Sequence, residues 1–284
     1  MILRYYSAAL LIGILLNSNV VAQDLSFQQF DEDFPNRPIV DFVEDDRGFM
    51  WIATYGAGIY RFDGISYKSF LFDNQSELSL QSNFVLSAIQ DSQNRIWTGT
   101  DAGLSYYDEQ KDVFRRVVFT GLDIGNDENI SILSILDDGN KHLLLGTERN
   151  GLLIVDLPSK TDSSLMELSV IAIVPDCKIR DMDRTDDGTI YVGGDNGFRR
   201  YSPEQNALVN LSEKSNWLSM PVKSVTTHGQ TVWVGTVSNG LIKFEHDEGK
   251  TIVNRYPFTS KRIMDSKILN DHTLVCATEN DGLI

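Results

Sequence analysis

Ten polar side chains stand at two kinds of position that recur along this chain of 284 residues. One set follows short apolar segments, and its members are Tyr55, Asp101, Arg149, Asp195 and Asn239. The other set stands where an apolar segment begins, and its members are Arg37, Asn83, Asn129, Arg180 and Arg262. Phenol, amide, guanidinium and carboxylate groups can bind the hydroxyl or carboxylate groups of a small polar molecule. Whether these side chains act together depends on the elements that position them.

The sequence shows no arrangement of residues that would carry catalysis. It has no Ser/His/Asp or Cys/His constellation, no glycine-rich phosphate loop and no metal-ligand spacing. The acidic turns 44–48, 137–139 and 186–188 lack the alternating ligands and distal Glu of a calcium loop. We therefore expect no metal, no cofactor and no enzyme activity in this segment. Side-chain oxygens that accept hydrogen bonds from turn N–H groups would explain the acidic residues.

The charge balance excludes one large class of partner. Asp and Glu number 40 against 25 Lys and Arg, which gives a formal net charge of −15. An acidic surface repels phosphate backbones, so we expect no nucleic-acid binding.

The two cysteines, Cys177 and Cys276, exclude a disulfide scaffold. Cys276 lies in an apolar strand pattern, which favours a buried thiol.

A repeat of 42–47 residues organises the chain. Each copy contains a short apolar segment, found at Trp51–Thr54, Trp97–Thr100, Leu144–Thr147, Tyr191–Gly194, Trp233–Thr236 and Val275–Thr278. A glycine and an apolar residue follow each copy within five residues, and several turns carry Asn-Gly or Asp-Gly. Each period has room for four short antiparallel strands, and no stretch after the N-terminal leader has helical periodicity. This pattern predicts an all-β fold, a β-propeller of four-stranded antiparallel blades with six repeats present.

Aromatic and basic residues within the repeats have structural interpretations. Trp51, Trp97 and Trp233 lie between apolar neighbours in the second strand, where we expect packing anchors between blades. Arg115-Arg116 and Arg199-Arg200 could bind an anion, but adjacent residues on a strand point to opposite faces. We therefore expect these pairs to be solvated surface.

The N-terminus has the features of a secretory signal peptide. Arg4 precedes an apolar run at 8–16, and small residues lead to a cleavage site after Ala22. The rival interpretation is a retained membrane helix, but the run is about half the length needed. We expect residues 1–22 to be a signal peptide and 23–284 an exported, periplasmic propeller.

Residues 38–64 closely resemble the two-component regulator propeller repeat, as do 82–108 and, less closely, 222–244. The resemblance implies a seven-bladed propeller in the periplasmic sensor half of a membrane receptor. It further implies partners in the same receptor, namely a second propeller, a β-sandwich, a membrane helix and a histidine kinase. Such receptors often sense oligosaccharides, so the implied ligand is an oligosaccharide or another small polar molecule. A homodimer is compatible with this architecture.

The sequence stops inside the third strand of the sixth copy. We therefore expect an incomplete seven-bladed ring that is truncated at its C-terminus, although residues 25–30 could instead be an outer strand that closes a six-bladed ring. In either ring the ten polar side chains would converge at one end of the central axis. Two other functions stay open, an exported propeller enzyme of polysaccharide lyase or quinoprotein type and a protein-interaction scaffold.

Overall fold

A computed structural model describes residues 34–284 apart from the segments 122–128, 158–165, 212–214, 248–249, 257–261 and 271–272. The predicted signal peptide at 1–22 and the predicted strand at 25–30 lie outside the described residues. Residues 35–284 form one unit, which is the part discussed below. Within the described ranges, no helix combines the length and apolar character required to cross a membrane.

The described residues form successive antiparallel blades in which each strand pairs with the next. The first blade contains β1 (Ile39–Glu44), β2 (Met50–Thr54), β3 (Ile59–Phe62) and β4 (Tyr67–Phe70), and the second contains β5 (Val85–Gln90), β6 (Ile96–Thr100), β7 (Gly103–Asp108) and β8 (Val113–Gly121). The third contains β9 (Ile132–Asp137), β10 (His142–Thr147), β11 (Leu152–Asp156) and β12 (Met166–Val174), and the fourth contains β13 (Ile179–Arg184), β14 (Ile190–Gly194), β15 (Gly197–Ser202) and β16 (Ala207–Asn210). The fifth contains β17 (Val222–His228), β18 (Thr231–Thr236), β19 (Leu241–Asp247) and β20 (Lys250–Tyr256), and β21 (Ile263–Asn270) and β22 (Thr273–Thr278) follow as a sixth pair. Two short 3₁₀ helices are η1 (Pro203–Gln205) and η3 (Asn216–Ser219).

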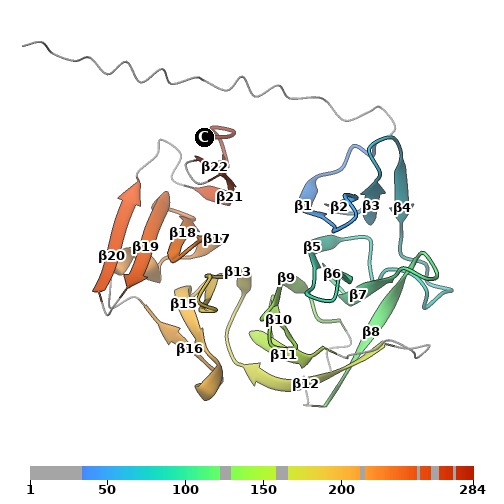
Figure 1. Ribbon diagram of the computed structural model, residues 1–284, viewed down its shortest axis with the longest axis horizontal. Helices are drawn as coiled ribbons and strands as arrows, with labels where there is room; N and C mark the ends of the chain where they lie inside the picture. Colours follow the sequence, from blue (N-terminus) through green and yellow to red (C-terminus); the bar gives the residue numbers. More distant parts are fainter. Residues whose placement is uncertain are drawn as a thin grey trace, which may run out of the picture. The chain divides into compact units, whose positions relative to one another are not determined.

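The predicted fold class is confirmed. The first strand of each blade contacts the first strand of the next, from β1 through β5, β9, β13 and β17 to β21. Figure 1 shows these six inner strands around a common centre, with the later strands of each blade farther out. The inner strands therefore supply the walls of whatever lies on the axis.

Apolar side chains hold the blades together through clusters that each combine residues of two consecutive blades. Trp51 is fully buried against Phe70 of its own blade and Tyr107 and Phe114 of the second blade. Trp97 is fully buried in the cluster between the second and third blades. Trp233 is partly buried and packs against the cluster between the fifth blade and the last pair. Side-chain burial between blades thus explains the aromatic positions of the repeat.

The glycine before the terminal Thr of the repeat has a steric cause. A Cβ added at Gly99 would lie 2.8 Å from Cγ2 of Ile132, on the inner strand of the next blade, and 2.5 Å from Oγ of Ser87. Gly146, Gly193 and Gly235 are crowded in the same way by Ile179, Val222 and Ile263. The motif keeps glycine because the next inner strand approaches too closely for a side chain.

Replacing Gly99 by Ala is therefore expected to lower the free energy of unfolding by about 1–3 kcal/mol, the usual cost of overpacking. Chemical denaturation followed by tryptophan fluorescence would measure the change. The reverse substitution at the equivalent position of the first blade, Ala53→Gly, serves as the control and should cost less than about 1 kcal/mol. Equal effects of the two substitutions would contradict the steric explanation.

Side chains of the repeat also close the turns. Thr54 Oγ1 donates to the carbonyl of Gly58 at 2.7 Å and accepts from the N–H of Ala57 at 3.2 Å. The same pair of hydrogen bonds recurs at Thr100, Thr147, Thr236 and Thr278. In the acidic turn 44–48, Asp45 accepts from the N–H groups of Arg47 and Phe49 and from Trp51 Nε1. This acidic side chain therefore stabilises its turn.

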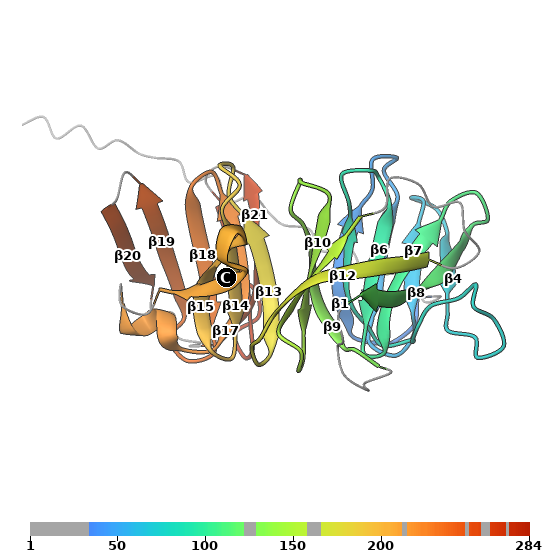
Figure 2. The ribbon, with the colours of Figure 1, turned by 90° about the horizontal axis from the view of Figure 1, so that it is seen from below.

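The outer strands of the second and third blades join in a way that the repeat does not predict. Residues 117–121 of β8 pair in parallel with residues 166–170 of β12, which merges the two blades into one eight-stranded sheet. Figure 2 shows β12 extending from its own blade to lie along β8. The pairing buries Val117, Leu168 and Val170 in the cluster between these blades.

The expectation that the adjacent arginines are solvated is wrong for Arg115 and Arg199. Arg115 is buried and pairs with Asp108 at 2.5 Å, and Arg199 is buried and pairs with Asp176. Carboxylates on neighbouring segments compensate the buried charges, and a residue pattern on one strand cannot show such a partner.

Candidate functional site

A β-bulge occurs at the same place in each of the six inner strands that the structure describes. In β13, for example, Ile179 pairs with Gly194 and Asp181 pairs with Gly193, so Arg180 is left without a partner residue. A bulge bends its strand and redirects a side chain. The bulged residues are Val40, Leu86, Leu133, Arg180, Lys223 and Met264, and we call them the bulge ring.

All six members of the bulge ring line a cavity of about 690 Å³ that is bounded by residues of all six inner strands. We call this space the axial cavity. Its volume lies within the range of pockets that bind small molecules. The bulges therefore place one side chain from each blade on the wall of a single cavity.

The residue after each bulge is Asp or Ser, and its side chain faces the next blade. Asp41 accepts from the N–H of Ala88 at 2.9 Å, and Asp181 accepts from the N–H of Val225 at 2.7 Å, each on the following inner strand. Among the described residues, the buried hydroxyls of Ser87 and Ser134 have no hydrogen-bond partner. The two aspartates thus reach the backbone of the next strand, whereas Ser224 Oγ lies 3.3 Å from the side-chain oxygen of Ser266 on β21.

Burial raises the pKa of these carboxyls. Burial raises the pKa of Asp41 to about 6, although the N–H of Ala88 and the charge of Lys267 act in the opposite direction. The pKa of Asp181 is raised well above its usual value, first by burial and further by the charges of Asp265 and Asp183. The axial cavity thus contains carboxyl groups that influence one another from different blades.

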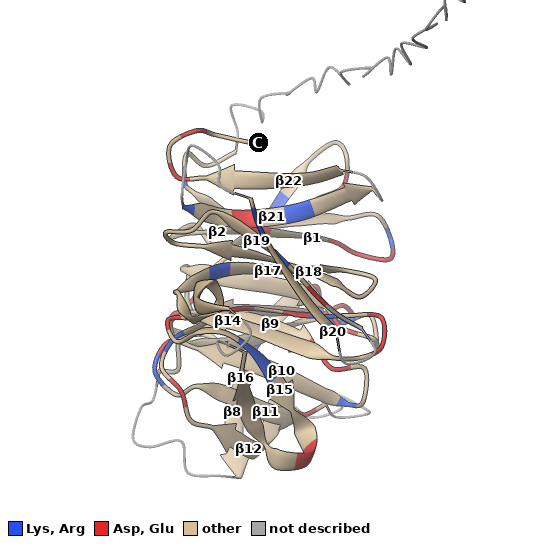
Figure 3. Ribbon diagram, turned by 90° about the vertical axis from the view of Figure 1, so that its left-hand side faces the viewer, with Lys and Arg blue, Asp and Glu red and all other residues tan. Residues whose placement is uncertain are grey.

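Of the predicted site residues, Arg180 lines the axial cavity, and Asp195 and Arg262 lie close enough to Lys223 to influence its amine. Arg180 pairs with Asp195, with 2.8 Å between Nη2 and Oδ1, and Arg262 pairs with Glu279. Arg149 lies close enough that its charge lowers the pKa of Glu148, although the main cause is a hydrogen bond from Lys178. Figure 3 shows basic ribbon positions at the same end of β17 and β21. We call this end, where the inner strands begin, the basic end.

The other predicted residues stand at the starts of the inner strands or in the turns after the second strands. Tyr55 is 50% exposed, and its ring meets that of Phe84 edge-on with 4.8 Å between centroids. The side chain of Asn83 stabilises the loop, because its Oδ1 accepts a hydrogen bond from the N–H of Phe72. Arg37, Asp101 and Asn129 are exposed, whereas Asn239 is partly buried. Of these residues, none lines the axial cavity.

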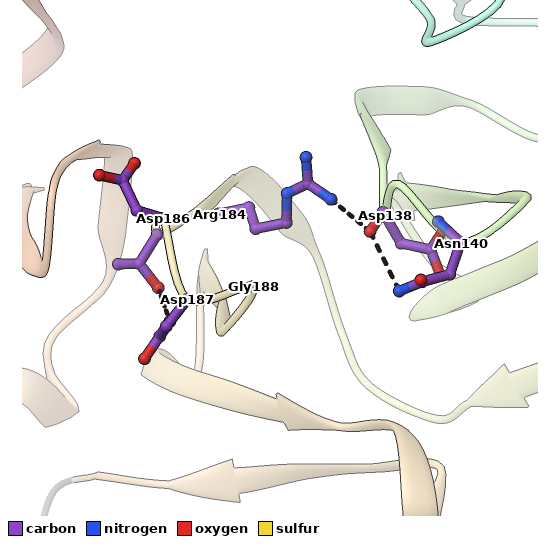
Figure 4. A pocket seen from close by; sticks show the side chains of 7 residues that line it. Asp138, Asn140, Arg184, Asp186, Asp187 and Gly188 are labelled. Carbon is purple, nitrogen blue, oxygen red and sulfur yellow. Dashed lines mark hydrogen bonds between the residues drawn. The ribbon is translucent and has the colours of Figure 1, made fainter.

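A second cavity, of about 620 Å³, lies at the opposite end of the inner strands, between turns of the third and fourth blades. Figure 4 shows Arg184 reaching across it to the carbonyl of Asp138. The carboxylate of Asp138 accepts from the N–H groups of Asn140 and His142, and that of Asp187 accepts from Thr185 and Thr189. Within the described ranges, no group of three or more His, Cys, Asp or Glu is placed to hold a metal ion. These two carboxylates thus accept hydrogen bonds within their own turns.

Lys223 is the main residue of the axial cavity that the sequence analysis missed. A repeated tripeptide could have revealed it, since each inner strand begins with Ile or Val, then the bulged residue, then Asp or Ser. The tripeptides start at Ile39, Val85, Ile132, Ile179, Val222 and Ile263. The middle position is Arg or Lys in the fourth and fifth blades and apolar in the others.

A family model described as two component regulator propeller matches residues 33–56 and 79–102, which cover the first two strands of the first and second blades. Two segments of this chain thus match the two-component regulator propeller repeat. The family resemblance inferred from the sequence is thereby confirmed. No curated protein sequence matches the chain.

Solved structures with the same fold include extracellular domains from B. thetaiotaomicron. That of the putative hybrid two component system BT3049 matches with a TM-score of 0.67 and 16% identity over 90% of this chain and 34% of that chain. That of the putative hybrid two component system BT4673 matches with a TM-score of 0.67 and 21% identity over 90% of this chain and 33% of that chain. PorZ of Porphyromonas gingivalis, a surface component of the type-IX secretion system, matches with a TM-score of 0.62 and 20% identity over 87% of this chain and 38% of that chain. At these identities the similarity establishes the fold, and the chain spans about a third of the length of each solved chain.

Proposed function

We propose that this chain is a ligand-sensing propeller of a membrane signalling receptor that binds an oligosaccharide or another small polar ligand in the axial cavity. The observation that carries the proposal is the bulge ring, which brings one side chain from each blade to the wall of one cavity. In this proposal the segment binds a ligand and carries no catalysis.

The family match and the likeness to extracellular receptor domains support this function. In this proposal residues 1–22 are a signal peptide cleaved after Ala22, and the propeller of residues 23–284 acts outside the cytoplasm. The basic end is the entrance for the ligand, with Arg149, Arg180, Asp195 and Arg262 around it. The exposed residues Arg37, Tyr55, Asp101 and Asn129 and the partly buried Asn83 would contact the outer parts of a longer ligand.

A second candidate follows from the fold that the chain shares with PorZ. In that case the propeller would be a surface component of a secretion system, and its surface rather than its axis would bind a partner. Deletion of the gene separates the two functions. Loss of a sensor abolishes the transcriptional response to an oligosaccharide, whereas loss of a secretion component abolishes export of surface proteins.

Thermal unfolding of the full chain with a panel of oligosaccharides tests the proposed function. A saccharide present at 100 times its Kd should stabilise the fold by about 2.7 kcal/mol, which raises Tm by roughly 5–10 °C. Arg180→Ala should lose this rise, and Arg200→Ala, an exposed arginine on β15, serves as the matched control. A panel without any stabilising saccharide, or an Arg180→Ala variant that responds like the unmodified chain, would contradict the proposal.

A further inference from the structure

The bulge ring is divided into two chemically different arcs. Val40, Leu86, Leu133 and Met264 present apolar side chains to the axial cavity, whereas Arg180 and Lys223 present cations. The two cations stand on β13 and β17, which are neighbouring inner strands. At the bulge ring a ligand therefore meets positive charge on one side and apolar surface on the other, while the rest of the cavity wall includes the carboxyls of Asp41, Asp181, Asp183 and Asp265.

Lys223 differs from the basic residues around it in having no counterion. Lys178 pairs with Glu148 at 2.6 Å, Arg180 pairs with Asp195, and Arg262 pairs with Glu279. Across the part of the chain that the structure describes, no carboxylate pairs with Lys223 and no group accepts a hydrogen bond from it. Lys223 is partly buried, so the missing partner leaves a charge that water compensates incompletely.

The electrostatic surroundings of Lys223 favour the binding of an anion. Burial lowers the pKa of the Lys223 amine, and the charges of Arg180, Lys178 and Arg262 lower it further. Asp195 acts in the opposite direction but is held by Arg180. An anion bound between these groups would relieve the repulsion among them.

The carboxyls deeper in the axial cavity do not provide the missing partner. Asp181 accepts from the N–H of Val225, and Asp183 accepts from the N–H and hydroxyl of Thr227. Both carboxyls thus accept hydrogen bonds from residues of β17 that follow Lys223 in the sequence. These bonds join the fourth and fifth blades. The position beside the Lys223 amine is left for an external group.

We propose that Lys223, with Arg180 beside it, binds the negatively charged group of an acidic ligand, a carboxylate or sulfate carried by a sugar. The body of that ligand lies against Leu86, Leu133 and Met264. The identification of the ligand as a sugar rests on the proposed function, whereas the anion site rests on the residues described above.

Isothermal titration of the full chain with trigalacturonate and with galactotriose, its uncharged counterpart, tests this site. Trigalacturonate should bind at least tenfold more tightly, and its affinity should fall as NaCl is added. Lys223→Met, which keeps an apolar stem at the bulge, should lose at least tenfold in affinity, and Lys223→Arg should retain binding. Lys111→Met removes the same charge from the exposed turn before β8 and should have no effect.

Lysine acetylation read by mass spectrometry gives a second readout that does not depend on the choice of sugar. Inorganic sulfate or trigalacturonate should slow acetylation of Lys223 at least threefold and leave Lys111 unchanged. If only sulfate protects Lys223 and neither saccharide binds, the anion site stands and the sugar part of the proposed function fails. If trigalacturonate binds equally well to the unmodified chain and to Lys223→Met, the inference is overturned while the proposed function stands. If neither anion protects Lys223 more than Lys111, the inference is overturned.

Discussion

Truncation of Trp51 to Ala is expected to lower the free energy of unfolding by about 3–5 kcal/mol. The indole is fully buried, contacts Phe70, Tyr107 and Phe114, and donates from Nε1 to Asp45 at 2.9 Å. Its removal leaves a cavity between the first two blades and a buried carboxylate oxygen without its donor. Equilibrium denaturation in urea, analysed for midpoint and slope, measures the loss.

Trp217 is the matched control, since it is 37% exposed and lies in η3 outside the blades. Trp217→Ala should change the free energy of unfolding by less than about 1 kcal/mol. Equal losses for the two variants would show that the inter-blade cluster is not what holds the first two blades together.

Replacement of Asp41 by Asn is expected to remove part of the pH dependence of stability. Burial raises the pKa of Asp41 from 3.8 to about 6, so the folded chain holds this proton more tightly than the unfolded chain. The resulting stabilisation is fully present below about pH 4 and is lost as the pH rises through 6. The raised pKa corresponds to at most about 3 kcal/mol of stability. The native chain should therefore weaken between pH 4 and 7 more than Asp41→Asn does.

The variant keeps the contact between blades because an amide oxygen can accept from the N–H of Ala88 as the carboxylate does. Lys267 and Asp265 on β21 also act on Asp41, and Asp181 and Asp183 retain their own raised pKa values in the variant. The difference between the two proteins, measured by urea denaturation at several pH values, isolates Asp41. Asp101→Asn, at an exposed carboxyl, is the control. Parallel pH profiles for the native chain and Asp41→Asn would refute the expectation.

The repeat was sufficient to predict the blades because its apolar segments and turns are local features. The short apolar segment at Trp97–Thr100 and the Asn-Gly turns at 150–151 and 239–240 depend on neighbours within a few residues. The same periodicity indicated which end of the inner strands would gather Arg180, Asp195 and Arg262. Their location at that end follows directly from the direction of each strand.

The site itself depends on contacts that periodicity does not encode. A bulge shifts Lys223 onto the wall of the axial cavity, and a simple alternation of strand residues gives no sign of that shift. The parallel pairing of β8 with β12 joins residues about 50 positions apart, so no local pattern could reveal it. The burial of Arg115 and Arg199 likewise depends on carboxylates supplied by other segments.

The structure of the full chain crystallised with trigalacturonate tests the central claim most directly. A carboxylate of the ligand should lie within hydrogen-bonding distance of Lys223 Nζ and beside Arg180, with the sugar against Leu86 and Met264. A ligand seated on an outer strand or in the turns around Arg184, with the axial cavity unoccupied, would contradict the account.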